Sequence, residues 1–201
     1  VVRMDPDPEQ GLLTTGYHVP PHTPLYAQAH GKGSLAARFR TCYPVTLWPL
    51  KVIYGGLESS NQYDFLDRRS DVLSVIRIRV EAEGLGLEDL EMSSLRFYFN
   101  RELRAASDLH ELVFAQLVGC VLLKEGATRG IDLGLDAVQP VGFGPDEFVL
   151  PFPRHINPGY RLLQEYFTFP RKYLFMDVNG LDQGLSGSSF DLLLLLGKPP
   201  E

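Results

Sequence analysis

Alternation of apolar and polar residues is the clearest structural signal in this chain. In residues 72–82, aliphatic residues alternate with charged residues, and residues 95–100 repeat the alternation with a leucine and phenylalanines. A period of two predicts strands with one buried face. A second pattern is a nearly continuous apolar run from Phe190 to Leu196, interrupted only by Asp191. This run predicts a strand that is covered on both faces.

Two other segments have the spacing of helices. Residues 107–117 place their apolar side chains on one helical face, and Ser107 is a suitable N-cap. The second helix is expected to begin at Pro158, with Asn157 as its N-cap, because proline loses no hydrogen bond at the first helical position. It should end before Pro170, since a residue that precedes proline is pushed towards extended geometry.

From residue 72 onward, the expected order of elements is strand, strand, helix, strand, strand, helix, strand, strand. Two helices are too few for strands that alternate regularly with crossover helices, which favours a largely antiparallel sheet. The predicted fold is therefore mainly β with a few helices (α+β). We expect an antiparallel sheet or β-sandwich with two helices packed on it, preceded by a smaller β-rich segment.

The polar stretch at residues 55–71 is the best candidate for a domain boundary on composition. We expect a β-rich N-terminal segment over residues 1–60, which includes a hairpin between residues 23 and 41. A sheet or sandwich domain should follow over residues 72–201. Because prolines interrupt the N-terminal strands, this segment is expected to lean on the following domain or on a neighbouring chain.

The most aromatic stretch runs from Pro158 to Val178 and has the sequence PGYRLLQEYFTFPRKYLFMDV. Its leucines and aromatic residues share one face of the expected helix, and a strand follows from Tyr173. Because aromatic side chains at such spacings usually pack, we predict a structural core motif here, with ligand stacking as the alternative. The residues of this predicted core motif are Leu162, Leu163, Tyr166, Phe167, Phe169, Pro170 and Phe175.

This stretch resembles a known protein family. Its LLQEYF and FP-x-K-x-LF parts resemble the motif of TssF, also called VasA or ImpG, a baseplate subunit of the bacterial type VI secretion system. Residues 38–50, RFRTCYPVTLWPL, and residues 95–100 are similar to the same family. Arg171 and Tyr173 depart from the family pattern, in which a small or acidic residue and a phenylalanine are expected.

The resemblance implies a fragment of a longer structural subunit that acts by protein–protein assembly, with no catalysis and no cofactor. It implies a cytoplasmic baseplate wedge docked at the inner membrane through other proteins, in a family itself similar to a contractile-phage wedge protein. The implied partners are a second TssF-like subunit and a TssG-like subunit, with other baseplate components. No individual contact residue follows from it, because the recognised motifs are expected to form core.

Charge and cysteine content argue against some other functions. The 201 residues carry a net charge of -6, with acidic and basic residues interspersed, whereas nucleic-acid binding requires a basic face. No apolar run approaches the roughly 20 residues of a membrane-spanning helix. Cys42 and Cys120 have no motif spacing, so a disulfide is not indicated and a reducing compartment is favoured. We predict neither a nucleic-acid partner nor direct membrane insertion.

No set of residues predicts an enzyme or a metal site. His18, His22 and His30 lie in a turn-rich stretch without a fourth ligand at a recognised zinc spacing. The GKGS sequence at residues 31–34 lacks the spacing of a phosphate loop. We therefore predict no catalytic, cofactor-binding or metal-binding residues.

Glu165 is the acid with the most unusual position, because it lies inside the aromatic motif. It can pair with Arg161 one helical turn earlier, or it can be partly buried against Lys172. Both arrangements are structural, and we favour a structural role over catalysis.

The alternative function is a ligand- or carbohydrate-binding β-sandwich module. Aromatic residues outside the central motif would form its platform if they are exposed. A bound ligand would raise the thermal stability by mass action, which a thermal-shift screen detects. The candidate platform residues are Tyr17, Tyr26, Trp48 and Tyr54.

Overall fold

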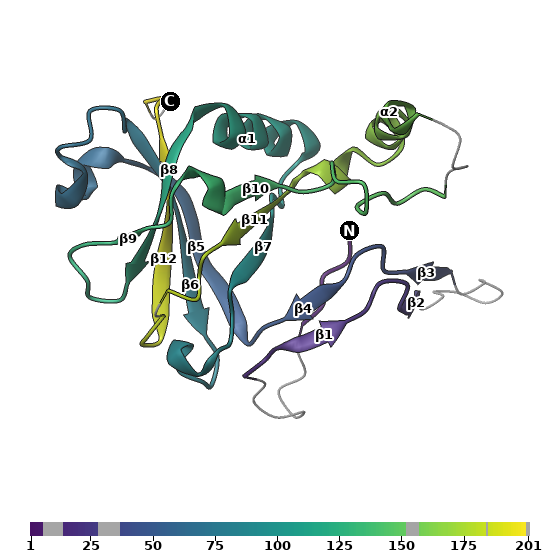
Figure 1. Ribbon diagram of the computed structural model, residues 1–201, viewed down its shortest axis with the longest axis horizontal. Coiled ribbons are helices and arrows are strands. Elements are labelled where there is room, and N and C mark those ends of the chain that lie inside the picture. The colour runs from purple at the N-terminus through teal and green to yellow at the C-terminus, as the bar shows by residue number, and fades with distance from the viewer. Residues whose placement is uncertain (6–13, 28–36, 152–156, 184, 200–201) are drawn as a thin grey trace.

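The main sheet has five antiparallel strands in the order β5, β6, β12, β8, β9. Figure 1 shows these elements in the computed structural model. The residues that the structure describes are 1–5, 14–27, 37–151, 157–183 and 185–199. The strands of the main sheet are β5 (Leu50–Ser59), β6 (Ser74–Ala82), β8 (Leu117–Lys124), β9 (Ile131–Asp132) and β12 (Ser189–Leu196).

Strand β12 lies in the centre of the main sheet because its apolar run can be buried on both faces. All of its residues are buried, as the continuous pattern predicted. Leu192 faces one layer of the core and Leu193 the other, which follows from the alternation of side chains along a strand. Asp191 is accommodated because Arg77 on β6 donates hydrogen bonds of 3.0 and 2.9 Å to its carboxylate.

A second, three-stranded antiparallel sheet covers one face of the main sheet. Its strands, in the order β10, β11, β7, contribute Val138 and Met176 to the core cluster that also contains Leu192. The two sheets therefore share one core. The described part of the chain is mainly β with two α-helices, so the predicted α+β class is confirmed. The strands of the second sheet are β7 (Ser94–Tyr98), β10 (Val138–Pro140) and β11 (Phe175–Asn179).

The first helix, α1 (Leu103–Gln116), packs against β8 and β12 of the main sheet. The prediction that it begins at Ser107 is wrong, because Glu102 is its N-cap. The Glu102 carboxylate accepts hydrogen bonds of 3.2 Å from the backbone N–H of Arg104. The Ser107 hydroxyl instead donates a 2.8 Å hydrogen bond to a backbone carbonyl one turn earlier.

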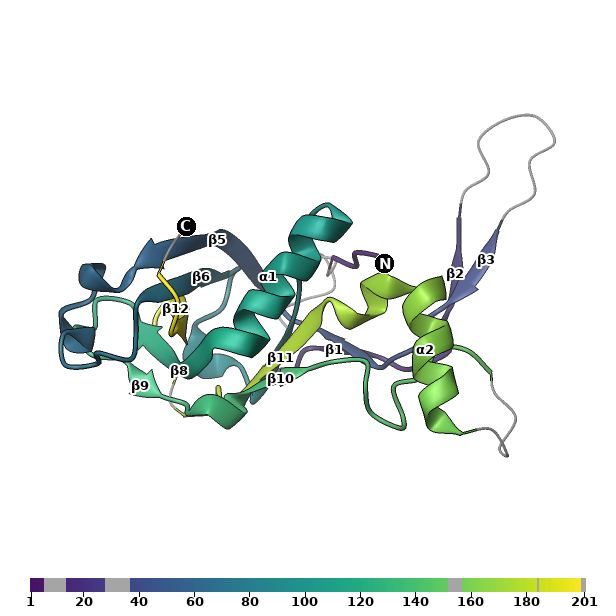
Figure 2. The ribbon, with the colours of Figure 1, turned by 90° about the horizontal axis from the view of Figure 1, so that it is seen from above.

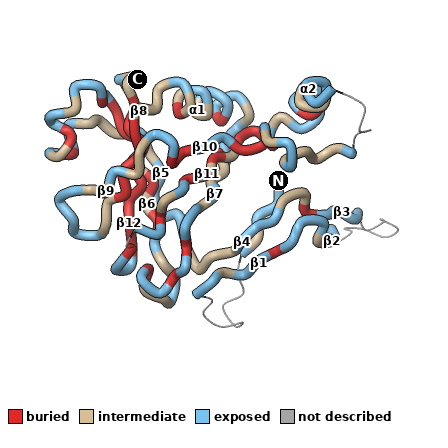
Figure 3. The backbone as a smooth tube through the Cα atoms, viewed as in Figure 1, coloured by how far each residue is buried: buried red, intermediate tan, exposed pale blue. Residues whose placement is uncertain are grey.

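The N-terminal strands form two short two-stranded sheets outside this core. β1 pairs with β4, and β2 pairs with β3, both antiparallel. The second pair confirms the hairpin predicted between residues 23 and 41, whose expected turn at residues 30–34 lies outside the described residues. Figure 3 shows these strands mostly exposed, in contrast to the main sheet. Their bounds are β1 (Tyr17–Val19), β2 (Pro24–Tyr26), β3 (Arg38–Arg40) and β4 (Val45–Leu47).

Strand β5 carries the main sheet across the predicted domain boundary. It pairs with β6 from its first residue to its last, with a register shift at Ile53. Gly55 and Gly56, which composition placed in the boundary stretch, are extended residues of β5. The strand thus joins part of residues 1–60 to the sheet of residues 72–201. The division into two domains stays a prediction, as does the expectation that the residues before β5 lean on the following domain or on a neighbouring chain.

The second helix, α2 (Pro158–Thr168), begins with Pro158 at its first position, as predicted. The Asn157 side chain caps it by accepting a 2.9 Å hydrogen bond from the N–H of Gly159. The helix ends before Pro170, where a 3-10 turn, η6 (Pro170–Tyr173), leads towards β11. Figures 1 and 2 place α2 away from the main sheet, at the end of the molecule from which β2 and β3 extend.

Candidate assembly surface

Helix α2 turns most of its apolar side chains away from the rest of the described structure. The side chains of Phe167 and Tyr160 are the most exposed, with residue exposures of 76% and 67%. Glu165, in contrast, is the one fully buried residue of this helix. We call the exposed apolar set, including one residue just after the helix, the α2 apolar face. It consists of Tyr160, Leu163, Tyr166, Phe167 and Phe169.

Part of the predicted core motif is not buried. The prediction that its members fill a core is wrong for Leu163, Tyr166, Phe167 and Phe169, which are exposed. Helical spacing gathers apolar side chains on one face but does not determine the direction of that face. The Phe175 ring on β11 lies 4.6 Å from the Tyr98 ring. A core role stays a prediction for the half-buried members, which are Leu162, Pro170 and Phe175.

The inner side of α2 is held by a buried ion pair between Glu165 and Lys172 of η6. Lys172 Nζ donates hydrogen bonds to Glu165 Oε2 and to the main-chain carbonyl oxygen of Glu147, the latter at 3.0 Å. Glu165 Oε1 accepts hydrogen bonds of 2.8 and 2.7 Å from the N–H groups of Val149 and Leu150. Both side chains are withdrawn from solvent. Each charge therefore has an opposite charge and hydrogen-bond partners, as burial requires.

Arg161 extends this arrangement one helical turn before Glu165. Its Nη2 donates a 2.7 Å hydrogen bond to the carbonyl oxygen of Leu150, and its Nε lies 3.8 Å from Glu165 Oε1. Its guanidinium carbon lies 3.9 Å from the centre of the Phe148 ring, within the range of a cation–π contact. Both pairings left open by the sequence are present. We call the set the polar clamp; it consists of Glu147, Arg161, Glu165 and Lys172.

The surroundings of Glu165 keep it charged. Burial acts to raise the pKa of its carboxyl, because desolvation disfavours the charged form. The hydrogen bonds from Lys172 and from the backbone N–H groups of Leu150 and Val149 act in the opposite direction and prevail. The pKa of Glu165 therefore lies below its ordinary value of 4.5. A carboxylate held in this way is an anchor for cationic and N–H groups, not a proton donor at neutral pH.

A loop before α2 joins the polar clamp to the N-terminal strands. The Tyr43 hydroxyl donates a 2.6 Å hydrogen bond to the carbonyl oxygen of Glu147, which Lys172 also binds. The Glu147 carboxylate accepts hydrogen bonds of 2.8 and 2.9 Å from the N–H groups of Gly142 and Gly144. Burial raises the pKa of Tyr43, which keeps its hydroxyl proton available as a donor. The sequence did not identify this contact, because no periodic pattern links residues 104 positions apart.

The whole chain, residues 1–201, matches the family described as type VI secretion system, TssF. The chain belongs to the TssF family. The resemblance found in residues 158–178 and in residues 38–50 is thereby confirmed.

Two known TssF-related chains extend this comparison. The type VI secretion system component TssF1 of Pseudomonas aeruginosa is 29% identical to this TssF-family chain, over 98% of this chain and 33% of TssF1. A chain in the cryo-electron microscopy structure of the TssK-TssF-TssG baseplate subcomplex is 26% identical and superposes with a TM-score of 0.76. That superposition covers 94% of this chain and 34% of the other. The chain therefore spans about a third of the length of these relatives.

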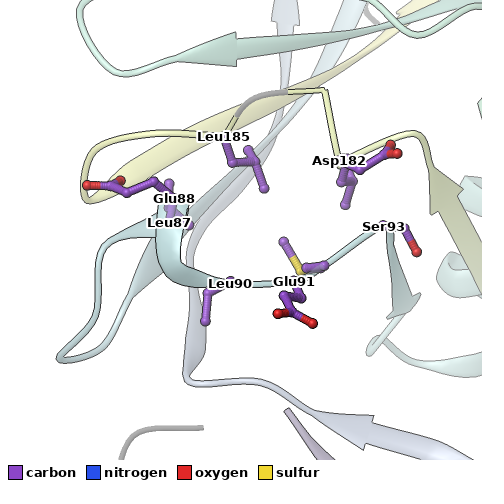
Figure 4. Close-up of a pocket in the computed structure, with 9 residues that line it drawn as sticks. Leu87, Glu88, Leu90, Glu91, Ser93, Asp182 and Leu185 are labelled. Atoms are coloured by element: carbon purple, nitrogen blue, oxygen red, sulfur yellow. The ribbon is translucent and has the colours of Figure 1, made fainter. Parts of the chain in front are cut away.

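A pocket of about 370 Å³ lies in another part of this TssF-family chain. Figure 4 shows its lining, in which Leu185 and other apolar side chains lie beside the acidic Glu88, Glu91 and Asp182. None of the described residues that line it is a histidine, cysteine, lysine or arginine. Glu88 also accepts a 2.9 Å hydrogen bond from the N–H of Gly187, which holds a turn. The lining of the pocket therefore combines apolar side chains with three acidic residues.

The aromatic residues of the alternative binding platform lie on separate elements of this TssF-family chain. Tyr17, Tyr26 and Tyr54 are exposed on β1, β2 and β5, which belong to three different sheets. Trp48 is partly buried against the main core. Among the described residues, no ring contact joins any two of these four side chains. They do not form a stacked platform.

Cys42 and Cys120 are both free thiols in this TssF-family chain. Burial raises the pKa of the Cys120 thiol to about 12, so it is protonated at neutral pH. In the part of the chain that the structure describes, no three histidine, cysteine or acidic side chains are grouped to hold a metal ion. His30 and residues 31–34 lie outside that part. Over the same residues, no helix combines the length and apolar character needed to span a membrane.

Proposed function

We propose that this chain is part of a structural subunit of a bacterial type VI secretion baseplate wedge, which acts by protein–protein assembly without catalysis. Its membership of the TssF family supports this proposal. So does its similarity to a chain of the TssK-TssF-TssG baseplate subcomplex. The observation that carries the proposal is the α2 apolar face, which the described structure leaves uncovered.

The α2 apolar face is comparable in size to the largest apolar patch of a typical monomer and smaller than one side of a stable interface. A fully buried aromatic side chain covers about 150–250 Å², so four partly exposed rings and one leucine expose on the order of 500 Å². The largest apolar patch on a typical monomer is about 300–600 Å². A stable interface needs roughly 800 Å² from each partner. The face is therefore the apolar centre of a larger contact.

The chemistry of the α2 apolar face favours another protein as its partner. Both charged residues of α2, Arg161 and Glu165, are turned into the polar clamp. An uncharged aromatic surface suits the apolar centre of a protein interface and offers nothing to phosphate groups. We assign it to a TssG-like subunit, because the solved assembly that this chain resembles contains TssG and TssK.

Other features of the predicted assembly belong to the same proposal. They are pairing with a second TssF-like subunit, contacts with further baseplate components, and a cytoplasmic position at the inner membrane reached through other proteins. Neither nucleic acid nor direct membrane insertion has a role in it.

Co-purification with a TssG subunit tests the assignment. A variant that combines Tyr166→Ser with Phe167→Ser is compared with wild type, each co-expressed with TssG from the same genome. The matched control is Phe39→Ser, which removes a 58% exposed ring from β3. We expect all chains to fold, the double variant to lose TssG, and the control to retain it.

The assignment to TssG is contradicted if the double variant retains TssG at the wild-type level. If wild type does not bind TssG but sediments as a dimer that the double variant dissociates, the α2 apolar face binds a second copy instead.

A further inference from the structure

Helix α2 has its apolar and charged faces reversed relative to an ordinary surface helix. Such a helix packs its apolar stripe on the core and exposes its charged residues. In α2, Glu165 is buried and Arg161 lies beside it, while the aromatic rings face outward. Among the apolar side chains of α2, only Leu162 is half-buried. Apolar burial is therefore too small to determine how α2 is rotated about its own axis.

The polar clamp supplies the contacts that apolar packing does not. Residues 147–150 belong to no helix or strand, so their backbone groups need partners elsewhere. Glu165 binds two N–H groups of this loop, and Lys172 and Arg161 bind two of its carbonyl oxygens. Side chains from α2 and η6 thus satisfy donors and acceptors of the loop. Each of these hydrogen bonds is directional and fixes one orientation of the helix.

One atom of this loop has two partners from distant parts of the chain. The carbonyl oxygen of Glu147 accepts from Lys172 Nζ at 3.0 Å and from the Tyr43 hydroxyl at 2.6 Å. Tyr43 lies between β3 and β4. Arg96 borders the contact, 5.8 Å from the centre of the Tyr43 ring and 3.9 Å from the Glu147 carboxylate. The N-terminal strands and α2 are therefore attached to the same carbonyl group.

We propose that Glu165 and Lys172 are positioning residues that hold α2 with its apolar face outward, and that the Glu147 carbonyl couples this position to the N-terminal strands through Tyr43. What the face binds rests on the proposed function, but the coupling does not. Removing one charge of the pair leaves the other buried without its opposite charge, which is costly. The clamp therefore releases α2 and the loop together when either charge is lost.

Amide hydrogen exchange of the complete 1–201 chain tests the positioning role, because it separates local opening from global unfolding. Lys172→Met removes one charge, and Glu165→Gln is a milder variant that keeps the shape of the side chain. We expect each variant to speed exchange in α2 and in residues 148–150 by about tenfold or more. Exchange in the main sheet should stay within about twofold of wild type.

The matched control for both clamp variants is Asp191→Asn, which weakens the Arg77 pair inside the main sheet. It should speed exchange in β6 and β12 and leave α2 close to wild type. Unchanged exchange in α2 in the clamp variants overturns the positioning role. A uniform increase over α2 and the main sheet also overturns it, because a pair that only adds global stability gives that result. If Lys172→Met does not fold, Glu165→Gln decides between these outcomes.

Tyr43→Phe tests the coupling, because it removes only the second hydrogen bond to the Glu147 carbonyl. In the wild-type background it should speed exchange at Val149 and Leu150 by about threefold or more. In the Lys172→Met background, where the clamp is already open, its effect should be clearly smaller. Equal factors in the two backgrounds overturn the coupling.

Failure of the clamp and failure of the proposed function give different results, since the exchange measurements need no partner. Slow α2 exchange in the clamp variants overturns the positioning role even if α2 binds TssG. Fast α2 exchange in the clamp variants supports it even if TssG binds another surface.

Discussion

Replacing phenylalanine by alanine at two positions separates the core from the α2 apolar face. Phe190 on β12 is 1% exposed, and Phe167 on α2 is 76% exposed. Both substitutions delete the same ring, so a difference in the free energy of unfolding reports the surroundings. We expect Phe190→Ala to be strongly destabilising and Phe167→Ala to be nearly neutral.

The magnitudes follow from the burial of the two rings. Phe190 packs in the main core, and replacing a buried phenylalanine by alanine costs about 3–5 kcal/mol. About a quarter of Phe167 is covered, which is roughly 50 Å² of a side chain of about 200 Å². At about 25 cal/mol per Å², this burial contributes at most about 1.3 kcal/mol. The higher helix propensity of alanine offsets about 0.5 kcal/mol of the stability lost in Phe167→Ala.

Urea titration followed by circular dichroism and by the fluorescence of Trp48, the single tryptophan, measures both effects. The midpoint of Phe167→Ala should lie close to that of wild type with an unchanged slope, and the shift for Phe190→Ala should be several times larger. Equal destabilisation of the two variants would refute the reasoning, because it would place the Phe167 ring in a buried environment. That result would also contradict the proposed assembly surface.

The polar clamp, α1 and the edge of the main sheet give three further predictions. Lys172→Met leaves the Glu165 carboxylate without its partner and opens α2 locally, so denaturant titration of the main sheet should show a loss under about 0.5 kcal/mol, whereas a loss of about 3–5 kcal/mol would show that the pair stabilises the whole fold and does not act on α2 alone. Burial lowers the pKa of His110 below 6.5, so stability should fall as pH drops below about 6.5, where the unfolded chain takes up the proton. Between about pH 7.5 and 5.5, the urea midpoint of His110→Phe should fall less than that of wild type. An equal fall in the two proteins would show that other groups cause the pH dependence. A chain of residues 72–201 lacks β5 and leaves the edge of β6 open, so sedimentation should show that it self-associates. A chain that begins at Pro49 keeps β5 and should stay monomeric. A stable, monomeric 72–201 chain would instead support the predicted domain division.

Strands β6, β7 and β12 could be predicted from the sequence because the local pattern of apolar residues determines which of their faces are buried. In β6, Ile76, Ile78 and Val80 are buried in the main core, as their alternation predicted. β12 is buried on both faces, as its continuous run predicted. The preference of proline for the first helical position also predicted the first residue of α2. Each of these features depends on neighbours in the sequence and on one period of side-chain direction.

Features that depend on distant residues could not be predicted in this way. The glycines of β5 give the composition of a loop, but pairing with β6 places them in a strand. The aromatic spacing of α2 defines a face, and whether that face is buried depends on the partners of Glu165 and Arg161. Those partners include backbone groups of a loop, which have no signature in the sequence. The Tyr43 contact is invisible for the same reason.

The polar clamp accounts for an exposed aromatic helix that does not turn inward. If only apolar contacts held α2, a half-turn about its axis would bury Tyr166 and Phe167 and be favoured by the hydrophobic effect. In the observed arrangement, that half-turn would break the pair between Glu165 and Lys172 and leave backbone groups of residues 147–150 without partners. Each unsatisfied buried group costs about 1–3 kcal/mol, and an unpaired buried charge costs more. Directional polar contacts therefore oppose the apolar collapse of α2, so its aromatic face stays available to a partner.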